Sequence, residues 1–137
     1  MIQSIRDLAQ RCFHLYYSAC VTMRAQGQMP SLEALQSRSL ELLQNNMLDA
    51  RSQRVFQNLL QTGTEIYLHF ALQGKVFVGI DDGVAVLCLA CAGTLQGSDA
   101  ITDVVAWCWR YAVCDTDPVA GYLNCEICNE PLIDPEL

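Results

Sequence analysis

Basic residues are scarce in this sequence. Its 137 residues include 8 Lys and Arg against 15 Asp and Glu, which gives a formal net charge of −7. A chain with this balance repels the phosphate backbones of DNA and RNA. The composition therefore excludes nucleic-acid binding as the main task of the protein.

Long hydrophobic runs are also missing. The apolar run from 83 to 95 is shorter than the roughly 20 residues that a transmembrane helix needs. The opening "MIQSIRDLAQRC" interrupts its apolar residues with polar ones, unlike a signal peptide. The closing "CNEPLIDPEL" carries no lipidation motif. We expect an intracellular protein without a transmembrane anchor, with at most peripheral membrane association, whose eight cysteines are reduced thiols.

Catalytic signatures are lacking too. The sequence has two histidines, His14 and His69, far apart along the chain. No G-x-S-x-G, P-loop, H-E-x-x-H or G-x-G-x-x-G motif occurs. We therefore expect a protein that is not an enzyme.

Apolar residues, in contrast, are plentiful. They make up 52% of the chain, and only 17% of it is charged, which is typical of an ordered domain rather than a disordered one. The length predicts a single domain over residues 1–137. Residues 129–137, with two prolines, are predicted to form an extended C-terminal tail.

The apolar residues recur at steps of three and four over most of the chain, which is the helical period. This pattern predicts an all-α fold, a single bundle of about seven helices around a buried central helix at about residues 83–96. The expected helices cover about the first 25 residues and the ranges 32–47, 49–60, 64–78, 84–95, 101–112 and 118–128. Thr62 and Glu65 have the spacing of a capping box and are expected to start the fourth helix.

Two CxxC pairs stand out among the cysteines. Cys88 and Cys91 are separated from Cys125 and Cys128 by 33 residues, and four thiolates in two such pairs are a common zinc ligand set. The segment "CEICNEPL" resembles the C-x-x-C-x-x-P-L knuckle of papillomavirus early proteins, which implies a zinc-binding viral adaptor. Alternatively, Cys88 and Cys91 share one face of a helix and pack there as small core residues.

The order of segments between residues 62 and 112 resembles the Bcl-2 family of apoptosis regulators. A capped helix, the turn "GIDDG", the apolar run "VAVLCLACAGTL" and then "VVAWCWRYAV" follow one another as in that family. Gly79, Ile80 and Gly83 match the family's turn, and Trp107 matches the tryptophan of the partner helix. Val84 stands where the family has an arginine. The short chain is similar to viral homologues, especially those of gammaherpesviruses.

This resemblance implies a viral, anti-apoptotic interaction protein of the host cytoplasm, recruited to mitochondria through its partners. It would bind amphipathic death-motif helices of host pro-apoptotic proteins in a hydrophobic groove, without a cofactor. The groove candidates are Phe56, Leu59, Phe70, Phe77, Val78, Gly83, Val84 and Leu87. The sequence thus leaves two interpretations open, a metal-free helical groove and a zinc-binding adaptor.

Overall fold

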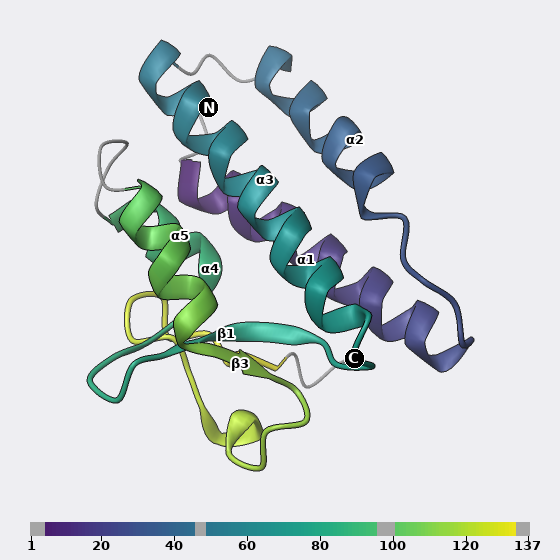
Figure 1. Cartoon of the computed structure of the whole chain (residues 1–137). Coiled ribbons are helices and arrows are strands. Elements are labelled where there is room, and N and C mark those ends of the chain that lie inside the picture. The colour runs from purple at the N-terminus through teal and green to yellow at the C-terminus, as the bar shows by residue number, and fades with distance from the viewer. Residues whose placement is uncertain (1–4, 46–48, 96–100, 134–137) are drawn as a thin grey trace.

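The computed structural model describes residues 5–45, 49–95 and 101–133. Figure 1 shows a layer of three long helices packed beside a shorter helix pair and a small antiparallel sheet. Within the described residues there are five α-helices and one three-stranded sheet. The expected all-α bundle of about seven helices is therefore wrong.

The long helices are α1 (Ile5–Ala25), α2 (Leu32–Asn45) and α3 (Ala50–Ala71). The first two confirm the helices expected from the spacing of apolar residues. Asp49 begins α3, because its side chain accepts a hydrogen bond from the Ser52 backbone N–H at 2.7 Å.

Helix α3 replaces two expected helices with one. The expected capping box lies inside it, and Thr62 donates its hydroxyl to the carbonyl of Asn58 within the same helix. Gly63 does not interrupt the helix. A Cβ atom at Gly63 would lie 2.3 Å from the Phe13 ring of α1, so glycine allows the two helices to approach closely. The expected helix over 64–78 is therefore wrong beyond Ala71.

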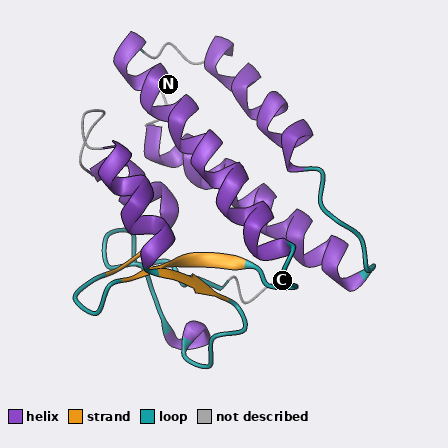
Figure 2. Ribbon diagram, viewed as in Figure 1, coloured by secondary structure: helices purple, strands orange, loops and turns teal. Residues whose placement is uncertain are grey.

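The sheet consists of β1 (Phe77–Asp81), β2 (Val86–Leu87) and β3 (Ala112–Cys114), in the order β2-β1-β3 (Figure 2). The segment "DDG", which precedes the helix expected over 84–95, forms the turn between β1 and β2. The Asp82 carboxylate accepts the backbone N–H groups of Val84 and Ala85 at 2.9 and 2.8 Å. Gly83 has a φ of 87°, which side chains disfavour.

The central helix predicted over residues 83–96 is wrong for 83–95, the part of this range that the structure describes. The apolar run is divided between the turn, strand β2 and the seven-residue helix α4 (Leu89–Leu95). Val84 lies at the tip of the turn with 90% of its surface exposed. The run is uncharged because two separate elements, β2 and the described part of α4, are each largely buried. It does not form one helix surrounded by others.

The C-terminal third completes the sheet. Helix α5 (Ile101–Arg110) leads directly into β3, which pairs with β1, so the helix expected over 101–112 ends early. The helix expected over 118–128 is wrong. Only a 3-10 turn forms there, at Ala120–Tyr122, and the chain then makes a hairpin through the second CxxC pair.

The core lies between the long helices and the sheet. Tyr16, Tyr67 and Phe77 make edge-to-face contacts, with ring centroids 5.7 Å apart for the first pair and 5.2 Å for the second. A polar clamp closes one end, where the Asp115 carboxylate accepts the Val76 N–H at 3.0 Å and pairs with Arg24 at 2.7 Å. None of the helices in the described part of the chain is both long and apolar enough to cross a membrane.

Candidate metal centre

The two CxxC pairs meet in space. The sulfur atoms of Cys88, Cys91, Cys125 and Cys128 all lie within 4.8 Å of one another. The sulfurs of Cys88 and Cys128, which are 40 positions apart in sequence, are 4.0 Å apart. The fold thus brings together two segments that lie on either side of α5 and β3, and the metal ligands proposed from spacing alone form one cluster.

The first pair sits where β2 gives way to α4. Cys88 follows the strand, Cys91 lies in the first turn of the helix, and the Ala92 N–H donates to the Cys88 carbonyl at 3.0 Å. Helix α4 packs tightly against α3 because Gly93 faces it: a Cβ there would lie 2.2 Å from a methyl carbon of Leu59. The position of the first two thiols is therefore fixed by the core.

The second pair lies on a tight hairpin that we call the knuckle, residues 124–131. The Cys125 N–H donates to the Glu130 carbonyl at 2.8 Å, and the Asn129 N–H donates to the Cys125 carbonyl at 2.8 Å. Asn129 has a φ of 63°, in the left-handed region that asparagine tolerates better than most residues. This backbone turn directs both knuckle thiols to the same side.

The knuckle is attached to the sheet. The Glu126 N–H donates to the Val86 carbonyl at 2.8 Å, and the Glu126 carboxylate accepts the N–H of Val86 in return. Leu132, just past the knuckle, covers Gly79 of β1, where a Cβ would lie 2.8 Å from its methyl carbon. The four thiols are therefore held by the sheet and by the helical core together.

Electrostatics differ among the four thiols. Burial opposes ionisation of Cys125, but hydrogen bonds from the backbone of Cys128, Cys88 and Ile127 outweigh it and lower the pKa of Cys125 to about 7. Burial raises the pKa of the Cys88 and Cys91 thiols. Arg6 counteracts this at Cys91, since its Nε donates to the Cys91 sulfur at 3.3 Å. The site thus offers backbone and side-chain donors to sulfur, as thiolate ligands require.

The arrangement fits a single zinc ion. Zinc binds thiolates at about 2.3 Å in a tetrahedron, which places its ligand sulfurs about 3.8 Å apart. The 4.0 Å separation of Cys88 and Cys128 is close to this value. An iron–sulfur cluster shares its four cysteines among more than one iron and needs a wider cage. Four soft ligands at this spacing therefore favour one tetrahedral ion of the zinc type.

The other four cysteines lie elsewhere in the core. Cys12, Cys20, Cys108 and Cys114 are all buried, and none of them belongs to the four-thiol cluster. Burial raises the pKa of Cys20 and of Cys108 to about 12. These residues act as small apolar side chains, and they serve as internal controls for cysteine substitution.

The groove candidates do not line one surface. Five of them are buried within the fold: Phe56, Leu59, Phe77, Val78 and Leu87. Phe70 is partly buried and packs on Phe77 with ring centroids 6.3 Å apart. Gly83 and Val84 are exposed at the β1–β2 turn, and nothing lies within 4 Å of a Cβ placed on Gly83.

A cavity of about 710 Å³ does exist, between α1 and the knuckle. Its apolar walls come from Phe13 and Tyr17 of α1, Val78 of β1 and Leu132. Val78 is the one groove candidate that contributes to it. The cavity borders the cysteine cluster, because Cys88 and Glu130 also line it.

Three residues around the cluster could not be identified by sequence reasoning alone: Arg6, Glu126 and Glu130. Arg6 lies off the apolar stripe of α1, which gives no hint of a contact 85 positions away. Asn129 did carry a signal, because a residue that tolerates positive φ directly after C-x-x-C is typical of a tight metal-binding turn.

Asn129 offers a test of the knuckle backbone. Replacing Asn129 by Val should destabilise the protein by about 1–2 kcal/mol and weaken zinc retention, because a β-branched residue is strained at positive φ. Asn129→Gly is the matched control and should stay close to wild type. Urea unfolding with zinc analysis measures both effects. Equal stability of the two variants would contradict the left-handed conformation at this position.

The chain was compared with known proteins. No protein-family model, no curated protein and no solved structure matches it.

Proposed function

We propose that this chain is a zinc-binding adaptor, a protein-interaction domain whose sheet and knuckle are organised by one ion on Cys88, Cys91, Cys125 and Cys128. The observation that carries the proposal is the convergence of all four sulfurs to within 4.8 Å from two distant segments. The spacing and the "CEICNEPL" segment resemble the zinc modules of papillomavirus early proteins, which supports the same interpretation.

The role of the ion is structural. All four sulfurs come from the protein, so a tetrahedral ion has no open position for a substrate or water. A bound zinc ion joins the β2–α4 junction to the knuckle. The residues around it contribute donors to sulfur and hold the two segments at the right distance.

The adaptor part of the proposal is supported by the cavity beside this centre. Its floor is apolar and its rim carries Arg11, His14 and Glu130, a combination typical of sites that bind part of another molecule by apolar contact and orient it by charge. The knuckle forms one wall of the cavity. Zinc binding would therefore control the shape of the interaction surface.

The Bcl-2-like function stays a prediction. No feature of the described residues favours it, because the segment expected to form the buried central helix is divided between a turn, strand β2 and the short helix α4, and Val84 is exposed at the tip of that turn.

Metal analysis of the purified chain tests the proposal. We expect about one zinc per chain in the wild type, and loss of that zinc in Cys125→Ser, because a tetrahedral centre with three thiolates binds zinc far more weakly. Cys114→Ser removes a buried cysteine outside the cluster and should keep the zinc. Wild-type protein refolded with zinc yet free of it, or Cys125→Ser with full zinc content, would rule out this centre.

A further inference from the structure

Arg6 has an unusual position for a charged residue. It lies in the first turn of α1, yet its side chain reaches the cysteine cluster and is only 26% exposed. Its Nε donates to the Cys91 sulfur at 3.3 Å. Its Nη1 pairs with Asp7 of the same helix at 3.1 Å. The Arg6 guanidinium therefore makes a specific contact with a thiol of the cluster and is not simply solvated.

One guanidinium nitrogen is left over. The Nη2 atom of Arg6 is buried and has no hydrogen-bond partner within the described residues. A carboxylate oxygen of Glu130, on the knuckle, lies 3.8 Å from this nitrogen, too far for a hydrogen bond. A buried N–H without an acceptor is costly. Additional negative charge close to the Nη2 atom would stabilise it.

A metal centre supplies that charge. Four thiolates around a divalent ion carry a formal charge of −2, and such a charge in a partly buried place is stabilised by a cation and by hydrogen bonds to the sulfurs. Arg6 is a cationic side chain that donates directly to a sulfur of the cluster. Its planar guanidinium can direct more than one N–H at neighbouring acceptors, which a lysine cannot do.

The same side chain belongs to a contact between two parts of the fold. Gln10, one turn after Arg6 on α1, donates to the Glu130 carboxylate at 3.0 Å. Glu130 lies on the knuckle, next to Asn129 and Pro131. The start of α1 is therefore linked to the cysteine cluster by Arg6 and to the knuckle by Gln10. The cavity lies along the same face of α1.

We propose that Arg6 is the outer-sphere cation of the metal centre, and that its hydrogen bond to the Cys91 thiolate makes docking of the first turns of α1 on the cysteine cluster dependent on metal occupancy. This inference rests on the proposed zinc site and adds that metal binding governs the position of the first turns of α1. When the ion is bound, the thiolate charge holds Arg6 and the first turns of α1 in place. When the ion is absent, that charge is lost and the first turns of α1 are released.

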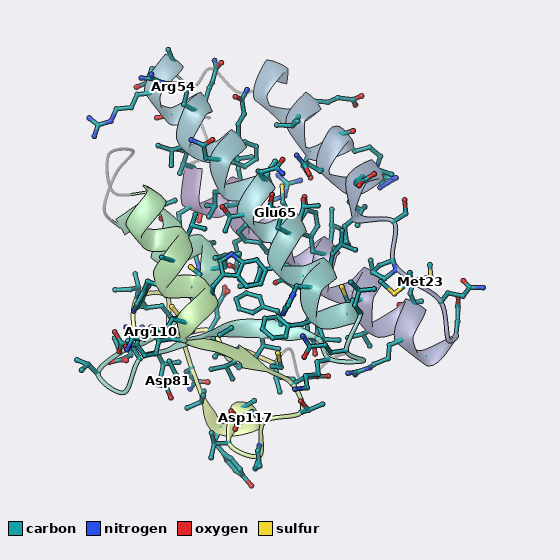
Figure 3. All side chains as sticks on the ribbon, viewed as in Figure 1. Met23, Arg54, Glu65, Asp81, Arg110 and Asp117 are labelled. Atoms are coloured by element: carbon teal, nitrogen blue, oxygen red, sulfur yellow. The ribbon has the colours of Figure 1, made fainter. Side chains whose placement is uncertain are left out.

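The test compares Arg6→Gln, which removes the charge, with Arg6→Lys, which keeps it. Arg54→Gln is the matched control. Arg54 is an exposed arginine near the N-terminal end of α3 and points away from the molecule (Figure 3). Each variant is loaded with cobalt(II) as a spectroscopic substitute for zinc. Cobalt affinity is measured by competition with a chelator, and the sulfur-to-cobalt charge-transfer band is recorded.

We expect Arg6→Gln to bind cobalt about 10- to 100-fold more weakly than wild type, and Arg6→Lys to fall between the two. Both should shift the charge-transfer band, because hydrogen bonds to a thiolate change its donor strength. A residue with only a role in folding would not move that band. Arg54→Gln should match wild type in affinity and spectrum. Circular dichroism checks that each variant is folded.

Hydrogen exchange measures the second half of the inference. Amides in the first turns of α1 should exchange slowly in the metal-bound wild type, and faster in metal-bound Arg6→Gln and in metal-free wild type, while α3 stays protected. If wild-type protein does not bind cobalt through its cysteines, the zinc proposal itself fails. If wild type binds cobalt and Arg6→Gln has the same affinity, band and exchange pattern, the zinc site stands and the role of Arg6 is refuted.

Discussion

Removing zinc should lower the midpoint of thermal unfolding by about 15–25 °C. Structural zinc contributes about 10 kcal/mol or more to small domains that depend on it. This chain also has a helical core that does not use the metal, so we expect a smaller loss of about 5 kcal/mol. For a chain of this size, each kcal/mol corresponds to about 3–5 °C. The measurement is a thermal melt with and without a high-affinity chelator at neutral pH.

The loss should be local. Helices α1 to α3 bury Tyr16, Phe56 and Leu60 completely, so much of the helical circular dichroism should survive chelation. Amides of β2 and of the knuckle should lose their protection from exchange first. Added zinc should restore the wild-type melt, whereas magnesium should not, because it prefers oxygen ligands. A chelated protein that melts at the wild-type temperature would contradict a structural metal centre.

The sequence predicted those parts of the fold that depend on local pattern. Helices α1 and α2 have a regular apolar stripe over many residues and are interrupted clearly at Gly27 and Pro30. Over the range of α3 the sequence predicts two helices, because Thr62 and Glu65 have the spacing of a capping box at a helix start. The reason for Gly63 is tertiary, since the ring of Phe13 occupies the space where a side chain would stand.

The sheet could not be predicted in the same way. Strand β2 has two residues and β3 has three, too few for a period of two to be seen. The central pairing joins Gly79 to Val113, which are 34 positions apart, and such partners are chosen by packing and not by local propensity. The uncharged run over 83–95 indicated burial, but burial alone does not distinguish a strand followed by a helix from one long helix.

The candidate site also combines features that local sequence predicts with features that depend on non-local contacts. The spacing of the two CxxC pairs predicted all four cysteines of the cluster, because the chemistry of zinc limits how ligand cysteines are arranged along a chain. Their convergence depends on α5 and β3 returning the chain to β1, which is a non-local event. The contact of Arg6 with the cluster could not be predicted, since the local sequence of α1 or of α4 does not indicate that the two helices meet.

Replacing Phe77 by Ala should destabilise the protein by about 3–5 kcal/mol. Phe77 is fully buried in β1, where its ring contacts Tyr67 at 5.2 Å and Phe70 at 6.3 Å between centroids. The substitution leaves a cavity between the sheet and α3, and a cavity of this kind costs about this much. Urea unfolding of the zinc-loaded protein measures the change, and zinc analysis should still find about one ion per chain, because Phe77 is not one of the four residues of the cluster.

Val84→Ala provides the contrast that decides between the sheet and the bundle expected from the sequence. In the bundle, Val84 would begin the buried central helix, and truncating a core side chain there should be costly. In the structure Val84 is 90% exposed at the β1–β2 turn, so its truncation should cost under about 0.5 kcal/mol. A loss at Val84 comparable to the loss at Phe77 would contradict the turn and the strand β2 that follows it. Because Cys88 follows β2, such a result would also remove the geometric basis for the metal centre.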